Sequence, residues 1–84
     1  KTHNIYPNPA NTNFTLPLSL TKKKVIEISI YNILGVKVST EKLNLSSGNH
    51  MIVKKFDLQS GQYFVNITDK NGLTIVTKKL LVVK

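Results

Sequence analysis

The sequence predicts an all-β fold, a small immunoglobulin-like antiparallel β-sandwich of about seven strands. Valine, isoleucine and threonine contribute eight residues each to a chain of 84, whereas alanine appears once and glutamate twice, which favours strands over helices. The glycines stand at positions 35, 48, 61 and 72, and this spacing of 11 to 13 residues is typical of turns in a β-sandwich. We therefore expect two packed sheets and no helix.

Two alternating runs, each followed by a turn, predict two β-hairpins. Apolar and polar residues alternate over 26–31, a turn follows at 32–35, and a second alternating run covers 36–40. The same arrangement recurs over 63–68, with a turn at 69–72 and a strand at 73–83. The residues expected in or near the core are Ile28, Ile30, Tyr63, Val65 and Ile67.

The sequence predicts three further strands, each shorter than the strands of the two hairpins. Met51 to Val53 predicts one strand, and the chain then crosses through Ser60–Gly61 to the next. The N-terminal part supplies two more, Asn4 to Tyr6 and Phe14 to Leu16, which we expect to be bounded by prolines because proline cannot donate a ladder hydrogen bond. A small barrel built from the same strands is the alternative architecture.

Length and charge limit the function classes. A chain of 84 residues forms one domain and buries only about 60 to 65% of its unfolded surface, and without cysteine it has no disulfide or thiolate metal site. The net charge of +8 comes from twelve lysines and no arginine, and arginine is the usual donor for bidentate base contacts. We therefore expect no nucleic-acid partner, and we expect the lysines to keep exposed strand edges in solution.

No residue pattern predicts catalysis, a metal or a cofactor. His3 and His50 stand alone, without acids at metal-ligand spacing. The four acids fall in separate strands or turns, so they do not predict an acid–base pair, and the glycines are too dispersed for a phosphate loop. The sequence predicts neither an enzyme nor a small-molecule substrate.

Four segments carry a more specific signal: YPNPA at 6–10, IYNILG at 30–35, LQSGQY at 58–63 and KKLLVVK at 78–84. In this order they resemble the type A C-terminal sorting domain of the type IX (Por) secretion system, over Asn4 to Lys84. That family combines a Y-P-N-P opening, an I-Y-(D/N)-x-x-G turn, an L-x-x-G-x-Y element and a lysine-rich last strand. The resemblance implies that residues 1–84 are a single sorting domain, carried at the C-terminus of a larger secreted protein.

The resemblance also implies a route and partners. The cargo would cross the inner membrane of a Gram-negative bacterium by a signal of its own and fold in the periplasm. This domain would then lead it through the outer-membrane type IX translocon, to be secreted or held at the cell surface. In the family a sortase-like surface peptidase commonly removes the domain, which itself catalyses nothing.

The expected recognition residues fall in the opening corner, in the third element and in the last strand. The corner prolines would turn the chain from one sheet edge toward the other, while the third element would form a tyrosine corner, with its ring in the core and its hydroxyl on a backbone carbonyl. The terminal strand would present an exposed edge to a partner's sheet, or to a second copy in a dimer. These residues are Tyr6, Pro7, Asn8, Pro9, Gly61, Tyr63, Lys78, Lys79, Leu80, Val82 and Lys84.

An extracellular immunoglobulin-like adhesion or carbohydrate-binding module is the alternative function. Such a module would need exposed aromatic side chains gathered on one face. The six aromatic residues of this chain fall mostly at predicted core or turn positions, which favours the sorting domain.

Overall fold

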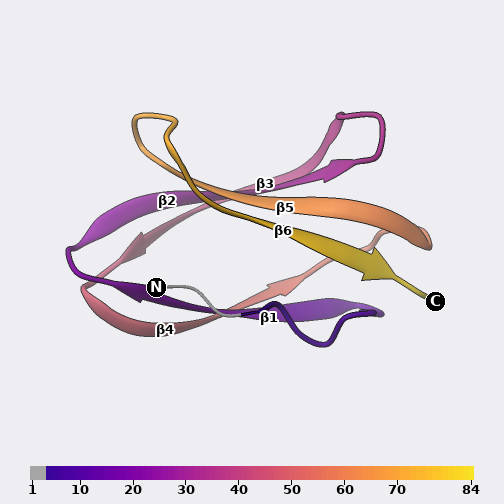
Figure 1. The fold of residues 1–84 in the computed structure, drawn as a ribbon, viewed down its shortest axis with the longest axis horizontal. Helices are drawn as coiled ribbons and strands as arrows, with labels where there is room; N and C mark the ends of the chain where they lie inside the picture. Colours follow the sequence, from indigo (N-terminus) through magenta and orange to yellow (C-terminus); the bar gives the residue numbers. More distant parts are fainter. Residues whose placement is uncertain (1–3) are drawn as a thin grey trace.

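Residues 4–84 are described by the computed structural model, and they form six antiparallel strands in two sheets (Figure 1). The smaller sheet pairs β1 with β4, and the larger has the order β3-β2-β5-β6. Over these residues no helix is present that could cross a membrane. The strands are β1 (Asn13–Leu20), β2 (Lys24–Asn32), β3 (Lys37–Leu45), β4 (Gly48–Lys55), β5 (Gly61–Asp69) and β6 (Thr74–Val82).

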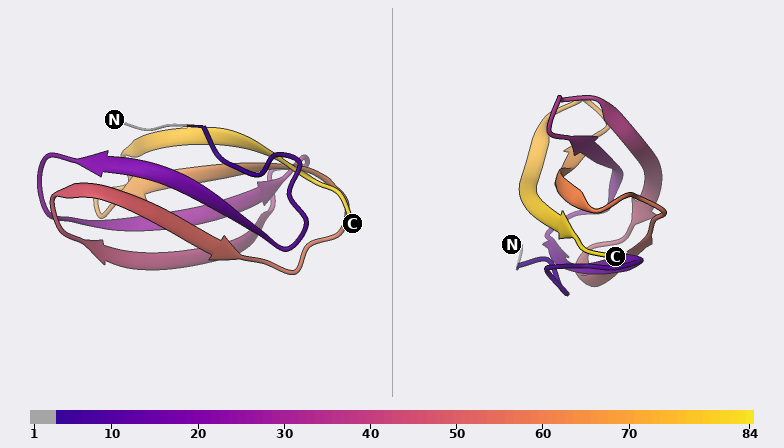
Figure 2. Two further views of the ribbon diagram at one scale, coloured as in Figure 1. Left: turned by 90° about the horizontal axis from the view of Figure 1, so that it is seen from below. Right: turned by 90° about the vertical axis from the view of Figure 1, so that its right-hand side faces the viewer.

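The core lies between the two sheets, which lie one above the other in Figure 1 and in the end-on view of Figure 2. Alternate residues of β2 and β5 point inward, and β1 supplies the facing layer with Phe14, Leu16 and Leu18. Every residue predicted in or near the core is buried, which confirms that prediction: Ile28, Ile30, Tyr63, Val65 and Ile67 are exposed by 9% or less.

Both predicted hairpins are confirmed, and side chains fix their turns. Asn32 accepts backbone N–H groups through Oδ1 from Leu34 (2.9 Å) and Val36 (3.0 Å). Asp69 does the same for the N–H groups two and four residues ahead, at 2.8 and 3.0 Å. Gly35 and Gly72 take φ values of 82° and 83°, the left-handed region that glycine enters without steric cost.

The seventh predicted strand is not formed, because Asn4 to Tyr6 contributes a single bridge. Tyr6 exchanges backbone hydrogen bonds with Thr15 of β1 at 2.9 and 2.6 Å, and the ladder stops there. Pro7 and Pro9 have no N–H to continue the ladder, and the side chain of Asn8 binds another strand. The segment therefore touches the edge of β1 without becoming a strand.

Proline does not end β1 as the sequence suggested. The prediction closed this strand at Leu16, whereas β1 runs on through Pro17 to Leu20. The backbone N–H and C=O of Thr15 point away from β4 toward Tyr6, and the backbone of Pro17, two residues on, points the same way. The missing N–H of Pro17 faces an open edge and costs no ladder bond.

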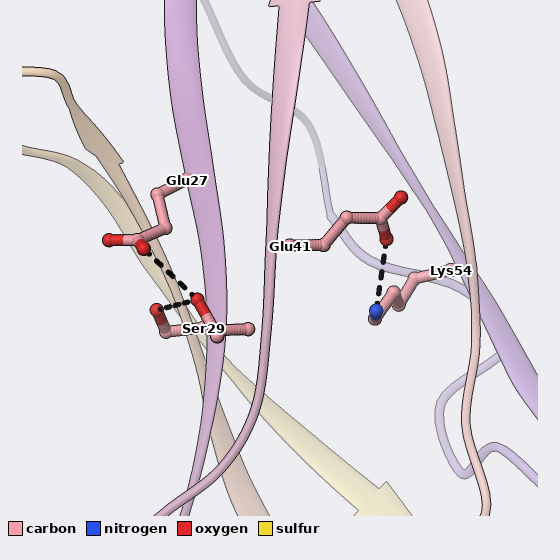
Figure 3. A network of polar contacts seen from close by, with 5 residues as sticks. Glu27, Ser29, Glu41 and Lys54 are labelled. Carbon is pink, nitrogen blue, oxygen red and sulfur yellow. Dashed lines mark hydrogen bonds and ion pairs between the residues drawn. The ribbon is translucent and has the colours of Figure 1, made fainter.

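On the side away from the corner, an ion pair links the two sheets. Glu41 of β3 and Lys54 of β4 meet at 2.9 Å, with the lysine side chain only 13% exposed (Figure 3). On the outer face, the Thr40 hydroxyl donates to Glu27 (3.1 Å) and lies 3.5 Å from the hydroxyl of Ser29. Polar groups thus join β2 to β3 and β3 to β4.

Truncation of an inward isoleucine should be costly. We expect Ile28→Ala to lower the free energy of unfolding by about 2 to 4 kcal/mol, because Ile28 is 1% exposed and its removal leaves a cavity in a thin core. Urea unfolding followed by circular dichroism measures this loss. The control Val53→Ala, at a side chain that is 60% exposed, should cost less than about 1 kcal/mol. Equal losses in the two variants would contradict the assigned core.

Candidate functional site

The opening corner and the terminal strand, at opposite ends of the sequence, lie against each other. Asn8 bridges them: its Nδ2 donates to the carbonyl oxygen of Lys79 (3.1 Å), and its Oδ1 accepts the N–H of Leu81 (3.0 Å). The carboxamide thus presents one donor and one acceptor to β6, as a peptide unit of a neighbouring strand would. The peptide bonds before Pro7 and Pro9 are both cis.

Ala10 continues the contact along the same edge. Its N–H donates to the carbonyl of Leu81 (2.7 Å), and its carbonyl accepts the N–H of Val83 (2.9 Å), which makes a parallel bridge to Val82. Ala10 is only 2% exposed, so this position leaves little room for a larger side chain. The corner therefore covers the outer edge of β6 from Lys79 to Val83.

This contact corrects the expectation of an exposed terminal edge. The N–H and C=O of Leu81 form hydrogen bonds with the corner, on the side of β6 away from β5. Backbone groups of alternate residues in a strand point to the same side, so those of Thr77 also point away from β5. In the part of the chain that the structure describes, nothing pairs with the outward groups of Thr77. Within residues 4–84, the corner occupies the half of the β6 edge nearest the C-terminus and leaves the first half uncovered.

The third motif supports the terminal strand from the other side. Gly61 pairs with Val82, and Tyr63 pairs with Leu80, across the β5–β6 ladder. The Tyr63 hydroxyl donates to the carbonyl oxygen of Gln59 (2.8 Å), which confirms the predicted tyrosine corner. This bond fixes the approach of the chain to β5.

The eleven predicted recognition residues thus gather around one edge, with different exposures. Leu80 and Val82 are exposed by 0% and 1%, so they are core residues that a partner cannot reach without unfolding the strand. Lys79 is exposed and Lys78 is half-buried. Lys84, beyond the end of β6, donates its N–H to Ser60 Oγ (3.0 Å) and places Nζ 3.1 Å from Asp57.

The arrangement offers groups for contact with another surface. Among residues 4–84, no three His, Cys, Asp or Glu side chains are grouped to hold a metal ion. The ring of His50 lies 2.7 Å from the carbonyl of Ser46, a contact within one turn region, and His3 lies outside the described residues. The groups at this surface are outward backbone groups, lysines and the corner.

Sequence reasoning missed two members of this site. The sequence patterns assign no role to the buried Ala10 or to the outward backbone of Leu81. One sequence signal for Ala10 is available, since the single alanine of the chain directly follows Pro9. The contact of Asn8 with β6 carries no local signal, because its partners Lys79 and Leu81 lie 71 and 73 residues away in the sequence.

Comparison with known proteins agrees with the motif order. A family model described as "Secretion system C-terminal sorting domain" matches residues 4–84. The chain is also similar to ulvan lyase NLR42 of Nonlabens ulvanivorans, with 32% identity over 77 residues. The matched region covers 92% of this chain and 14% of that protein, so the chain spans only a small part of its relative's length.

Removal of the Asn8 side chain should free the covered edge. In Asn8→Ala the Leu81 amide loses its acceptor, and we expect its hydrogen exchange to accelerate about tenfold. The central Val65 amide should accelerate no more than about fivefold, which is the effect of the lower global stability alone. Stability should fall by about 1 kcal/mol. Exchange measured by NMR tests this, with Asn44→Ala on the exposed face of β3 as a control. An unchanged Leu81 rate would mean that Asn8 does not hold the strand.

Removal of the Tyr63 hydroxyl should cost about 1 kcal/mol, because the carbonyl of Gln59 loses its donor in a partly buried position. Urea unfolding of Tyr63→Phe measures the loss. Tyr31→Phe is the matched control, since no hydrogen bond of the Tyr31 hydroxyl is found within residues 4–84, and it should leave stability unchanged within about 0.5 kcal/mol. If Tyr63→Phe is as stable as the control, the hydrogen bond of the tyrosine corner does not stabilise the domain.

Proposed function

The chain belongs to the family of secretion system C-terminal sorting domains, and from this premise we propose that it leads a larger cargo protein through the outer-membrane type IX translocon. Domains of this family are C-terminal secretion signals on cargo proteins, and they are not catalysts. They act with the type IX machinery of Gram-negative bacteria, and their cargos reach the cell surface or the medium.

We propose that residues 1–84 form one sorting domain, with the cargo fused on the N-terminal side. The route runs through the periplasm, where the cargo folds before it crosses the outer membrane. A sortase-like surface peptidase then separates the domain from its cargo. Support comes from the family match over 4–84 and from the small share of the larger lyase that the chain covers.

The observation that carries this proposal is the joining of the corner to β6. Asn8 and Ala10 place the Y-P-N-P motif on the backbone of the lysine-rich last strand, so two motifs of the family make one surface. The groups offered to the machinery are the exposed members of the predicted set, Tyr6 to Pro9 with Lys79 and Lys84, together with the half-buried Lys78. Gly61, Tyr63, Leu80 and Val82 hold that surface from beneath.

Pairing through an edge strand is proposed only for the half of β6 that the corner leaves uncovered. Thr77 points its backbone outward there, and the sheet of a partner, or a second copy in a dimer, would add at this position. Lys78 and Lys79 flank the uncovered half, and repulsion between equal charges would weaken a dimer made there.

Fusion to a reporter tests sufficiency. A fluorescent protein directed to the periplasm and followed by residues 1–84 should reach the cell surface or the medium of a host with a matching type IX system. Surface fluorescence and cell fractionation measure the transfer, and the same reporter without the domain is the control. Reporter that stays in the periplasm while the host exports its own cargos would count against the function.

Charge reversal tests whether the lysines are read. In the double variant Lys79→Glu and Lys84→Glu we expect a melting temperature near that of the unaltered domain, because the Lys84–Asp57 pair is exposed and contributes less than about 1 kcal/mol. Export of the reporter should fail, because complementary acidic groups of the machinery would be repelled. Lys54 is not suited to this test, because it pairs with Glu41 across the two sheets and its substitution would lower the stability of the domain. Export at the unaltered level would show that these two charges are not part of the signal.

A further inference from the structure

The two hairpin turns have the same hydrogen bonds and opposite side-chain chemistry at their two central positions, while the residue after the glycine is exposed and apolar in both, Val36 and Leu73. In each, the first residue donates its N–H to the carbonyl four residues ahead, at 3.0 Å from Asn32 and 2.9 Å from Asp69. In each, the glycine N–H returns to the carbonyl of the first residue at 3.0 Å. Both first residues also use Oδ1 in the same two bonds. The turns are therefore an internal matched pair.

They differ at their two central positions. The β5–β6 turn has Lys70 and Asn71 there, as expected for a turn in water. The β2–β3 turn has Ile33 and Leu34, whose exposed fractions are 70% and 83%. Since the same backbone is made with polar residues, the fold does not require apolar side chains at these positions.

The exposed apolar group extends beyond the turn itself. Val36 is 54% exposed and follows Leu34 closely in the chain, and we call Ile33, Leu34 and Val36 the β2–β3 tip. Asn32 holds the backbone of two of its members through Oδ1, so the tip is presented in a fixed shape. A preorganised apolar projection loses little conformational entropy when it is buried by a partner.

The end of the domain opposite the tip is rich in lysine. Figure 1 places the two turns at opposite ends of the strands, and the domain is 36 Å long. A hollow at the far end is lined by Lys22, Lys23, Lys24 and Lys70. Near the tip, Lys37 has its Nζ 5.8 Å from the ring centroid of Tyr31.

We propose that the β2–β3 tip is a docking element that inserts into an apolar pocket with an acidic rim, on a protein of the export machinery. This inference rests on the proposed function and names the chemistry of its partner. The acidic rim follows from charge complementarity, since the domain carries a net charge of +8 and Lys37 stands beside the tip.

Two other occupants fit less well. A second copy would bring two charges of +8 together, and three side chains on each copy fall far short of the roughly 1,200 Å² that a stable interface buries. A lipid surface with anionic headgroups would attract the four-lysine end first, and that end lies away from the tip. A protein pocket suits a small, rigid apolar projection.

The test exchanges the central residues of the two turns. The tip variant Ile33→Lys, Leu34→Asn copies the β5–β6 turn, and we expect its melting temperature to stay within about 4 °C of the unaltered domain. Export of the fluorescent reporter should fall at least about tenfold, because buried anchors dominate such contacts. The variant Lys70→Ser, Asn71→Ser changes the matched positions of the other turn, and it should be exported normally.

A transposed variant separates position from composition. It combines the tip changes with Lys70→Ile and Asn71→Leu, so the apolar pair is kept but moved to the far end, and its export should fail as well. Normal export of the tip variant or of the transposed variant, while the unaltered reporter is also exported, overturns this inference alone. Retention of the unaltered reporter overturns the proposed function, and the inference falls with it.

Two solution measurements address the other occupants. Sedimentation of the unaltered domain should show a monomer, and vesicles of anionic phospholipid should bind the tip variant, which has one more lysine, at least as tightly as the unaltered domain. A dimer that the tip variant abolishes would assign the tip to self-association and overturn the proposal. Vesicle binding that the tip variant loses would assign the tip to the lipid surface, with the same consequence.

Discussion

The hydrogen bonds between the opening corner and β6 are the constraint on which the shape of this domain depends. A sheet of four strands and a sheet of two leave open sides, and an open side exposes unpaired backbone groups to any passing strand. Asn8 and Ala10 satisfy the outer edge of β6 near the C-terminus, while Tyr6 bridges to β1. One short segment therefore touches both sheets on this side of the core, as the end-on view in Figure 2 indicates.

The other open edges are handled by different chemistry. β1 places Pro17 where the missing N–H faces outward, so that part of its edge has one donor fewer to offer. Between β3 and β4 the link is electrostatic, and Glu41 meets Lys54 where a continuous ladder is absent. Net positive charge adds a general barrier to edge pairing between copies. Within residues 4–84 these edges are thus covered, deprived of a donor or charged over part of their length, while the first half of the β6 edge stays uncovered.

Local patterns predicted most of the fold, because the strand period and the turn residues act over a few positions. The alternation in β2 and β5 identified the inward side chains, and Asn32 and Asp69 stand where their turns begin. Long-range pairing was not predictable in the same way. Nothing near Asn8 in the sequence indicates that its partners are Lys79 and Leu81, and the seventh strand was expected because a single bridge and a strand share one local pattern. For the candidate site, the motifs were identified from sequence, but which of their residues are exposed required the packing: Leu80 and Val82 are core, and Lys79 is not.

The contact between Ala10 and Val82 also bears on the timing of synthesis. The corner is translated before every strand of the domain and β6 after all the others, so the bridge between them forms only when the whole domain has been made. A polypeptide terminated early, at any point before β6, has the corner motif without the strand that it covers. Because the strands are translated in chain order, a surface made jointly by the corner and β6 exists only on chains that have been translated through β6. A secretion apparatus that reads this surface would leave prematurely terminated products behind without inspecting the cargo itself.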